Sequence, residues 1–159
     1  MRSILLAVAL SLALPAAAFA AGGGADPAPA VQAKPVDPNY ARAKQMIEAR
    51  DYRNSLPLLQ QVVAKDPRNA DAYNLMGYAT RSAGDANGSL QYYQQALAID
   101  PRHLGAHEYI GEAYLMLNRP AEAQQHLARL DSLCVFGCTE YRMLKAAIAN
   151  YNAGKRPTN

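Results

Sequence analysis

Cys134 and Cys138 are the only cysteines of this 159-residue chain, and their spacing suits several kinds of thiol chemistry. Residues four apart can bring their Cα atoms to roughly 6 Å, within disulfide range, and Gly137 between them lets the backbone adjust. Two thiolates at this spacing could instead bind copper or act on another protein's disulfide. We expect a disulfide that closes a small loop and contributes about 2 kcal/mol; a copper-handling or thiol-redox pair is the alternative.

His103 and His107 are spaced to share one face of a helix, which would let them chelate a metal. Two histidines alone make a weak site, and His126 lies eight residues before Cys134 without an obvious way to join the cysteines. We therefore expect His107 to be a packing residue, and we predict no metal site and no cofactor.

Other chemical motifs are few. Asn87-Gly88-Ser89 matches a glycosylation sequon, but we expect Ser89 at a close-packed helix position, so we treat the match as chance. The sequence contains no glycine-rich phosphate loop, no nucleophile elbow and no carboxylate pair with a reason to be buried together. We predict that the protein has no catalytic residues and is not an enzyme.

The segments that position these residues repeat along the chain. Asp66-Pro67-Arg68 and Asp100-Pro101-Arg102 lie 34 residues apart, and 34 further from Asp100 lies Cys134. When the chain is aligned at this spacing, equivalent positions, which we call columns, hold residues of one kind. Two columns hold small residues: Ala43, Gly77 and Gly111, and Ser55, Ser89 and Ala123. A third holds the large residues Leu59, Tyr93 and Leu127. A fixed period of this length is typical of stacked supersecondary units.

These columns resemble the tetratricopeptide repeat (TPR), over about 100 residues from near Val36 to Leu133. The most typical copy carries the family's signature positions at Tyr73, Met76, Gly77, Ser89, Tyr93, Ala96 and Pro101. The resemblance implies three helix-turn-helix repeats, at about residues 36–69, 70–103 and 104–137. It implies an all-α fold of the α-solenoid type.

Helical periodicity in the sequence agrees with that assignment. Two apolar stripes in each unit are separated by the breakers Arg50-Asp51, Gly84-Asp85 and Asn118-Arg119-Pro120. We expect Gly77 and Gly111 to let the first helix of a pair approach Ser89 and Ala123 of the second. Pro57 would be tolerated if its helix starts at about Asn54 or Ser55.

A last amphipathic helix follows the repeats at about residues 139–153. Tyr141, Leu144, Ile148 and Tyr151 form its apolar stripe, and Gly154 is its expected stop. Such a helix would cover the exposed apolar side of the last repeat. We therefore predict seven helices, three pairs and a capping helix, in a TPR domain of residues 38–153 with a disordered tail at 154–159.

The amino-terminal segment predicts export. Arg2, the apolar run from Ile4 to Leu14 and the small residues ending at Ala20 form the pattern of a signal peptide at residues 1–20. The apolar run is short of the ~20 residues of a membrane span. Residues 21–37 are rich in Ala, Gly and Pro and are expected to be a flexible linker. We expect a periplasmic protein, or a secreted one without an outer membrane, with no stable membrane anchor and in an oxidising compartment.

The TPR resemblance implies a groove lined by the first helices of the repeats, which holds a segment of a partner protein. When the three repeats are aligned with the family's pattern, the groove positions are occupied by Tyr40, Lys44, Ile47, Glu48, Asp71, Asn74, Tyr78, Arg81, Glu108, Glu112, Leu115 and Met116. The acidic third-repeat share suggests a partner with a basic or amidated segment beside an apolar anchor. Leu75, Gly105 and Tyr109 stand where family members that clamp a terminal carboxylate carry basic and asparagine side chains, so that subclass is disfavoured.

These expectations favour a non-enzymatic scaffold for protein–protein interaction in envelope, secretion or cofactor-assembly processes. The alternative is a periplasmic thiol-redox or copper-handling protein that uses Cys134 and Cys138. A third hypothesis is that the protein associates with itself through an exposed end of the repeat array. The formal net charge of +3 is small and dispersed, so we expect no nucleic-acid partner.

Overall fold

The computed structural model describes residues 36–155. Within that range the chain has seven helices and no strand: α1 (Pro38–Glu48), α2 (Tyr52–Lys65), α3 (Ala70–Ser82), α4 (Ala86–Ile99), α5 (Leu104–Met116), α6 (Pro120–Leu133) and α7 (Thr139–Asn152). The predicted signal peptide, residues 21–35 of the predicted linker and residues 156–159 of the predicted tail lie outside the described residues. No helix within the described range is both long and apolar enough to cross a membrane.

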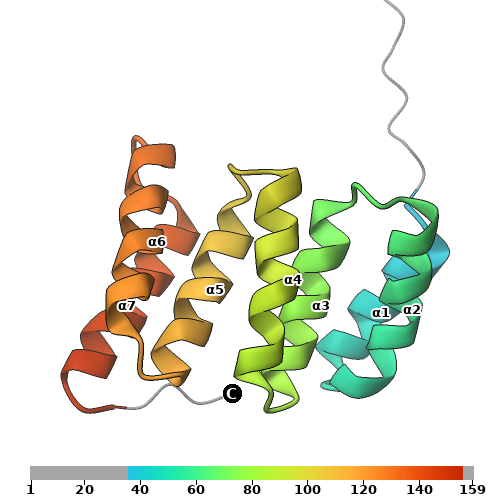
Figure 1. Ribbon diagram of the computed structural model, residues 1–159, viewed down its shortest axis with the longest axis horizontal. Coiled ribbons are helices and arrows are strands. Elements are labelled where there is room, and N and C mark those ends of the chain that lie inside the picture. The colour runs from blue at the N-terminus through green and yellow to red at the C-terminus, as the bar shows by residue number, and fades with distance from the viewer. Residues whose placement is uncertain (1–35, 156–159) are drawn as a thin grey trace, which may run out of the picture. The chain divides into compact units, whose positions relative to one another are not determined.

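Neighbouring helices pack into three successive pairs, α1 with α2, α3 with α4, and α5 with α6 (Figure 1). The last helix, α7, lies against both α5 and α6. The predicted all-α solenoid of three repeats and a capping helix is therefore confirmed.

The turn inside each pair has the same backbone conformation. Arg50, Gly84 and Asn118, again 34 residues apart, each take a positive φ of 61°, 104° and 60° respectively. The residue after each turn donates its N–H to a carbonyl near the end of the first helix, in the bonds Asp51–Met46, Asp85–Thr80 and Arg119–Tyr114 of 2.8, 3.1 and 2.8 Å. These are the left-handed helix ends expected where a chain must reverse at once.

The turn after each pair is also shared, and it includes Cys134. The residues that end α2, α4 and α6 are Asp66, Asp100 and Cys134, with φ/ψ of −131°/83°, −128°/95° and −115°/77°. Each carbonyl accepts a hydrogen bond from the N–H three residues on, at 3.1, 3.1 and 2.9 Å. Cys134 thus stands in the structural place of the two aspartates, as its column in the sequence indicates.

Proline and polar caps set the helix starts. Asn69 and Asp85 each accept a hydrogen bond from a backbone N–H in the first turn of the helix that follows, at 2.9 and 2.7 Å. Pro57 departs from the expectation. The helix begins at Tyr52, with a first helical hydrogen bond from Ser55 N to Asp51 O, so Pro57 lies inside α2 and forgoes one bond of the ladder.

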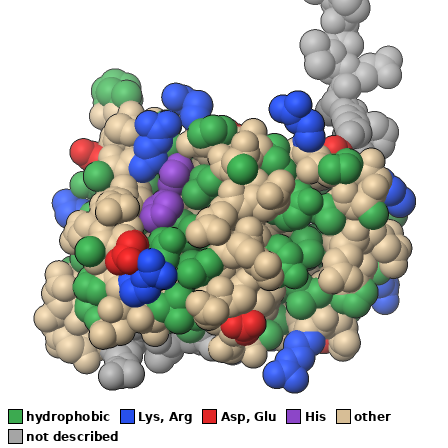
Figure 2. All heavy atoms as spheres, viewed as in Figure 1, with side chains coloured by type: hydrophobic (Ala, Val, Ile, Leu, Met, Phe, Trp, Pro, Cys, Tyr) green, Lys and Arg blue, Asp and Glu red, His purple; other side chains and the backbone are tan. Residues whose placement is uncertain are grey.

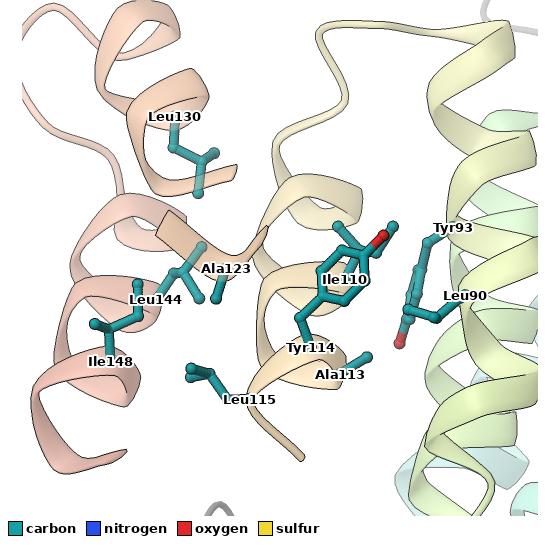
Figure 3. Packing of buried hydrophobic residues seen from close by; sticks show 10 residues of the cluster. All are labelled: Leu90, Tyr93, Ile110, Ala113, Tyr114, Leu115, Ala123, Leu130, Leu144 and Ile148. Carbon is teal, nitrogen blue, oxygen red and sulfur yellow. The ribbon is translucent and has the colours of Figure 1, made fainter. Parts of the chain in front are cut away.

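The two close-packed glycines make room for large side chains. A Cβ on Gly77 would lie 2.5 Å from the ring of Tyr93 in α4, and one on Gly111 would lie 2.6 Å from Leu144 in α7. The atoms nearest to these two positions thus belong to a bulky residue of the second helix and to the capping helix. Figure 3 shows Leu144 and Ile148 of α7 within the same apolar cluster as Ala123, Leu115 and Ile110.

Candidate partner-binding site

A pocket of about 370 Å³ opens on the side formed by the first helices of the repeats. Its walls come from α1, α3 and α5, together with the first residue of α2. The lining residues are Lys44, Ile47, Glu48, Arg50, Tyr52, Leu75, Tyr78 and Tyr109. We call this set the aromatic pocket.

Three tyrosines form the core of the aromatic pocket. The rings of Tyr52 and Tyr78 meet edge to face with centroids 6.2 Å apart, and those of Tyr78 and Tyr109 are tilted with centroids 5.1 Å apart. Burial, with a smaller contribution from the charge of Glu108, raises the pKa of Tyr109 to about 12, so its hydroxyl stays neutral at physiological pH. The pocket therefore offers ring faces and edges to an apolar guest.

A buried ion pair holds two of these rings in place. The Arg81 guanidinium lies 2.9 Å from a carboxylate oxygen of Glu112, and only 6% of Arg81 is exposed. The same guanidinium lies 5.5 Å from the ring centroid of Tyr78 and 5.8 Å from that of Tyr109. Cation–π contact and ion pairing thus link α3 to α5 behind the pocket.

The predicted groove residues separate into two groups. Lys44, Ile47, Glu48 and Tyr78 line the aromatic pocket. The others do not line it: Tyr40 is half-buried, Asp71 contacts His103 at 3.0 Å, Asn74 is buried, and Met116 accepts a weak hydrogen bond from Arg81 at 3.8 Å. Arg81 and Glu112 bind each other rather than standing free.

Glu108 and Leu115 belong to the interior. Glu108 is only 3% exposed and Leu115 only 1%, because α7 packs against α5 where a further repeat would lie. Burial, reinforced by the charges of Glu112 and Glu140, raises the pKa of Glu108 to about 8. With one carboxyl buried and Glu112 neutralised by Arg81, the expected acidic surface for a basic partner segment is absent from the described part of this repeat.

Four residues that line the pocket were not among the expected groove residues: Arg50, Tyr52, Leu75 and Tyr109. Leu75 and Tyr109 occupy the same repeat column, since they lie 34 residues apart, and served only as evidence against a carboxylate clamp. Two large apolar side chains in one column next to predicted groove positions were the available signal. No pattern in the sequence pointed to Tyr52, because its place in the pocket depends on the turn at Arg50.

Cys134 and Cys138 are joined by a disulfide in this structure, with Cα atoms 5.5 Å apart. The closed loop joins the end of α6 to the start of α7. Its two middle hydrophobic side chains face solvent: Val135 is 82% exposed and Phe136 is 100% exposed.

His103 and His107 have different partners and do not converge. His107 Nε2 lies 3.1 Å from the carbonyl oxygen of Pro101, and its Nδ1 lies 2.9 Å from Nδ1 of His126. A carbonyl only accepts, so His107 carries its proton on Nε2 and accepts on Nδ1 from the N–H of His126. Burial lowers the pKa of both rings, that of His126 to about 4. Within residues 36–155 no group of three or more potential ligands could hold a metal ion.

Ser89 of the sequon match is fully buried, and its hydroxyl donates to the carbonyl of Ala86 at 2.7 Å. This hydroxyl is therefore committed to helix packing, as expected.

Comparison with known proteins agrees with the repeat architecture. Two family models described as tetratricopeptide repeat match residues 40–103 and 81–148. No curated protein is significantly similar to the chain in sequence.

Several solved structures share the fold. MamA of Desulfovibrio magneticus RS-1 is 25% identical with a TM-score of 0.58, over 60% of this chain and 54% of its own. This chain thus spans about half the length of the MamA structures it matches. PcrH in complex with the chaperone-binding region of PopD is 18% identical with a TM-score of 0.65, over 74% of this chain and 90% of its own. The type III secretion translocator chaperone SycD of Yersinia enterocolitica is 15% identical with a TM-score of 0.64, over 74% and 88%. With its two family matches, its 34-residue columns and its three helix pairs, the chain belongs to the tetratricopeptide repeat family.

Proposed function

We propose that the protein is a non-enzymatic scaffold that binds a segment of a partner protein at the aromatic pocket. The observation that carries this proposal is the open pocket walled by Tyr52, Tyr78 and Tyr109, in which Arg81 of a buried ion pair contacts the rings of Tyr78 and Tyr109. A preformed apolar pocket lowers the ordering cost of binding, and aromatic walls supply most of the contact energy.

The chemistry of the pocket indicates what it selects. Its floor and walls are apolar and aromatic, while its rim carries Lys44 and Arg50 against the single carboxylate of Glu48. The partner segment therefore carries a large apolar or aromatic side chain with an acidic group beside it. This replaces the basic or amidated segment expected from the third repeat, whose carboxyl groups are buried or paired.

Two further observations support segment binding. PcrH, which shares the fold, is described in complex with the chaperone-binding region of PopD. SycD, which also shares it, is a secretion chaperone. The setting in envelope, secretion or cofactor-assembly processes rests on the predicted signal peptide and is part of the proposal.

The test is selection of binding peptides from a random library, followed by affinity measurement with two matched variants. Tyr78→Ala removes a pocket wall, whereas Tyr73→Ala removes the same atoms from a half-buried position of the same helix outside the pocket. We expect selected peptides to bind Tyr78→Ala about tenfold or more weakly and Tyr73→Ala as they bind the wild type. Equal binding by all three proteins would exclude the aromatic pocket as the site.

Arg81 is a poor choice for such a test. Its replacement would leave Glu112 without its ion-pair partner beside the core, so a loss of binding would not be separable from a loss of fold.

A further inference from the structure

A hydrophobic tip stands where α6 ends. Among the residues that the structure describes, the exposed large hydrophobic side chains are Val36, Val135, Phe136 and Met143, and two of these four are adjacent in the disulfide loop. In Figure 2 hydrophobic side chains project at the upper left, where Figure 1 places the end of α6. A phenylalanine left wholly in water is costly, and an exposed apolar patch commonly marks an interaction site.

A cross-link and a backbone hydrogen bond constrain the tip. The Cys134–Cys138 disulfide closes the loop, and the N–H of Gly137 donates to the carbonyl of Cys134 at 2.9 Å. Gly137 takes a φ of 75°, which a residue with a side chain rarely adopts. Phe136 is therefore presented on a short, cross-linked turn, so little conformational entropy is lost when it binds.

The same chain carries a site that suits this tip. The aromatic pocket offers three tyrosine rings for edge-to-face contact with a phenylalanine, and Ile47 and Leu75 for contact with a valine. Its rim carries Lys44 and Arg50, while the tip is flanked by Asp131 on the last turn of α6 and Glu140 on the first turn of α7. The tip and the pocket match in apolar character, and Asp131 and Glu140 are opposite in charge to Lys44 and Arg50.

We propose that the Val135-Phe136 tip of one copy inserts into the aromatic pocket of a second copy. This inference rests on the proposed function, because it names a second copy of this chain as an occupant of that pocket. The tip and the pocket are different surfaces, so the contact is heterologous and head to tail. A head-to-tail dimer still presents one free tip and one free pocket, so association proceeds to chains or closed rings.

Sedimentation velocity over a range of concentrations tests the association. We expect the wild type to grow in size with concentration and Phe136→Asp to remain a monomer. Met143→Asp is the matched control, since it places the same charge at another exposed hydrophobic position, and it should associate like the wild type. A wild type that stays monomeric at millimolar concentration, or a Phe136→Asp variant that associates as strongly, would overturn the proposal.

A mixing experiment tests the head-to-tail geometry. Phe136→Asp retains the pocket, whereas Tyr52→Ala retains the tip but loses a pocket wall. Each alone should be monomeric, and an equimolar mixture should form a one-to-one dimer and nothing larger. If the mixture stays monomeric while the wild type associates, the contact uses other surfaces and the proposal fails.

A synthetic peptide of residues 132–140 with its disulfide closed gives a second readout that requires no pocket variant. We expect it to bind the Phe136→Asp protein, to bind about tenfold more weakly when reduced, and to lose binding when its Phe136 is replaced by alanine. No binding of the closed peptide would count against the tip as a ligand. If library peptides still bind in a Tyr78-dependent manner, the scaffold function survives the failure of this inference.

Discussion

The second and third repeats carry the same groove columns, but the structure uses equivalent positions differently in the two repeats. Tyr78 of α3 and its column partner Glu112 of α5 illustrate the difference: the tyrosine lines an open pocket, while the glutamate is paired with Arg81. Glu108, which precedes Glu112 by one turn of α5, is buried beneath the junction of α5 and α7. A residue's repeat register therefore states which face it lies on, and the neighbouring helix decides whether that face is a surface.

The capping helix causes this difference. Leu144 and Ile148 of α7 are buried in the cluster that contains Ile110 and Leu115 of α5. Gly111 permits the approach, because any side chain there would collide with Leu144. The cap completes the hydrophobic core at the third repeat, and the aromatic pocket is lined by the first two repeats and by Tyr109.

Of the changes considered, truncation of Leu144 in the capping helix should lower the free energy of unfolding most. Leu144→Ala deletes a fully buried side chain and leaves a cavity, so we expect a loss of about 3–4 kcal/mol in the free energy of unfolding. Urea unfolding measures it. Met143→Ala, at the adjacent exposed position, should change stability by less than about 0.5 kcal/mol. Similar effects at both positions would mean that α7 is not packed as described.

The burial of Glu108 under the capping helix can be tested through the pH dependence of stability. Its pKa is about 8 in the folded chain against 4.5 for the ordinary group, so the folded state keeps a proton that the unfolded state releases. This contribution is fully present below pH 4.5 and is lost as the pH rises through 8. At pH 9 we expect Glu108→Gln to be more stable than the wild type by about 2–3 kcal/mol. Glu48→Gln, at the open pocket, is the control. It should leave the loss of stability with rising pH unchanged.

His126 gives the opposite pH dependence. Its pKa falls from 6.5 to about 4 on folding, because it is half-buried against His107. The stabilising contribution of the neutral ring is present above pH 6.5 and is lost as the pH falls towards 4. We expect His126→Gln to flatten the acid decline, with a gain of about 1–2 kcal/mol relative to the wild type at pH 5. His103→Gln, outside the His107–His126 pair, should keep the steep decline, and a flat wild-type profile would contradict the assignment.

The smallest effect is expected at the edge of the open pocket. Arg50 has a φ of 61°, which glycine adopts without strain. We expect Arg50→Gly to raise the free energy of unfolding by about 0.5 kcal/mol. The equivalent change in the other direction, Gly84→Ala, should lower it by about 1 kcal/mol. Thermal unfolding compares the two, and a loss of stability in Arg50→Gly would show that its side chain contributes more than the turn costs.

The sequence predicted the repeat, the helix pairs and the turns because these depend on local interactions. Gly84 and Asn118 favour a left-handed helix end, and Pro67 and Pro101 restrict the residue before them, whatever the rest of the chain does. The shared backbone at Asp66, Asp100 and Cys134 followed from counting alone. The lining of the pocket was predicted only in part: Lys44, Ile47, Glu48 and Tyr78 were among the expected groove residues, whereas Arg50, Tyr52, Leu75 and Tyr109 were not.

What the sequence determined by itself was thus the list of helices and the face on which each residue lies, because periodicity and turn chemistry act over a few residues. Tertiary structure alone decided which of those faces remained open. Burial of Glu108, pairing of Arg81 with Glu112 and convergence of three tyrosines each depend on contacts between helices far apart in the chain. The physical reason is that desolvation and packing are properties of the assembled helices, and no single repeat contains them.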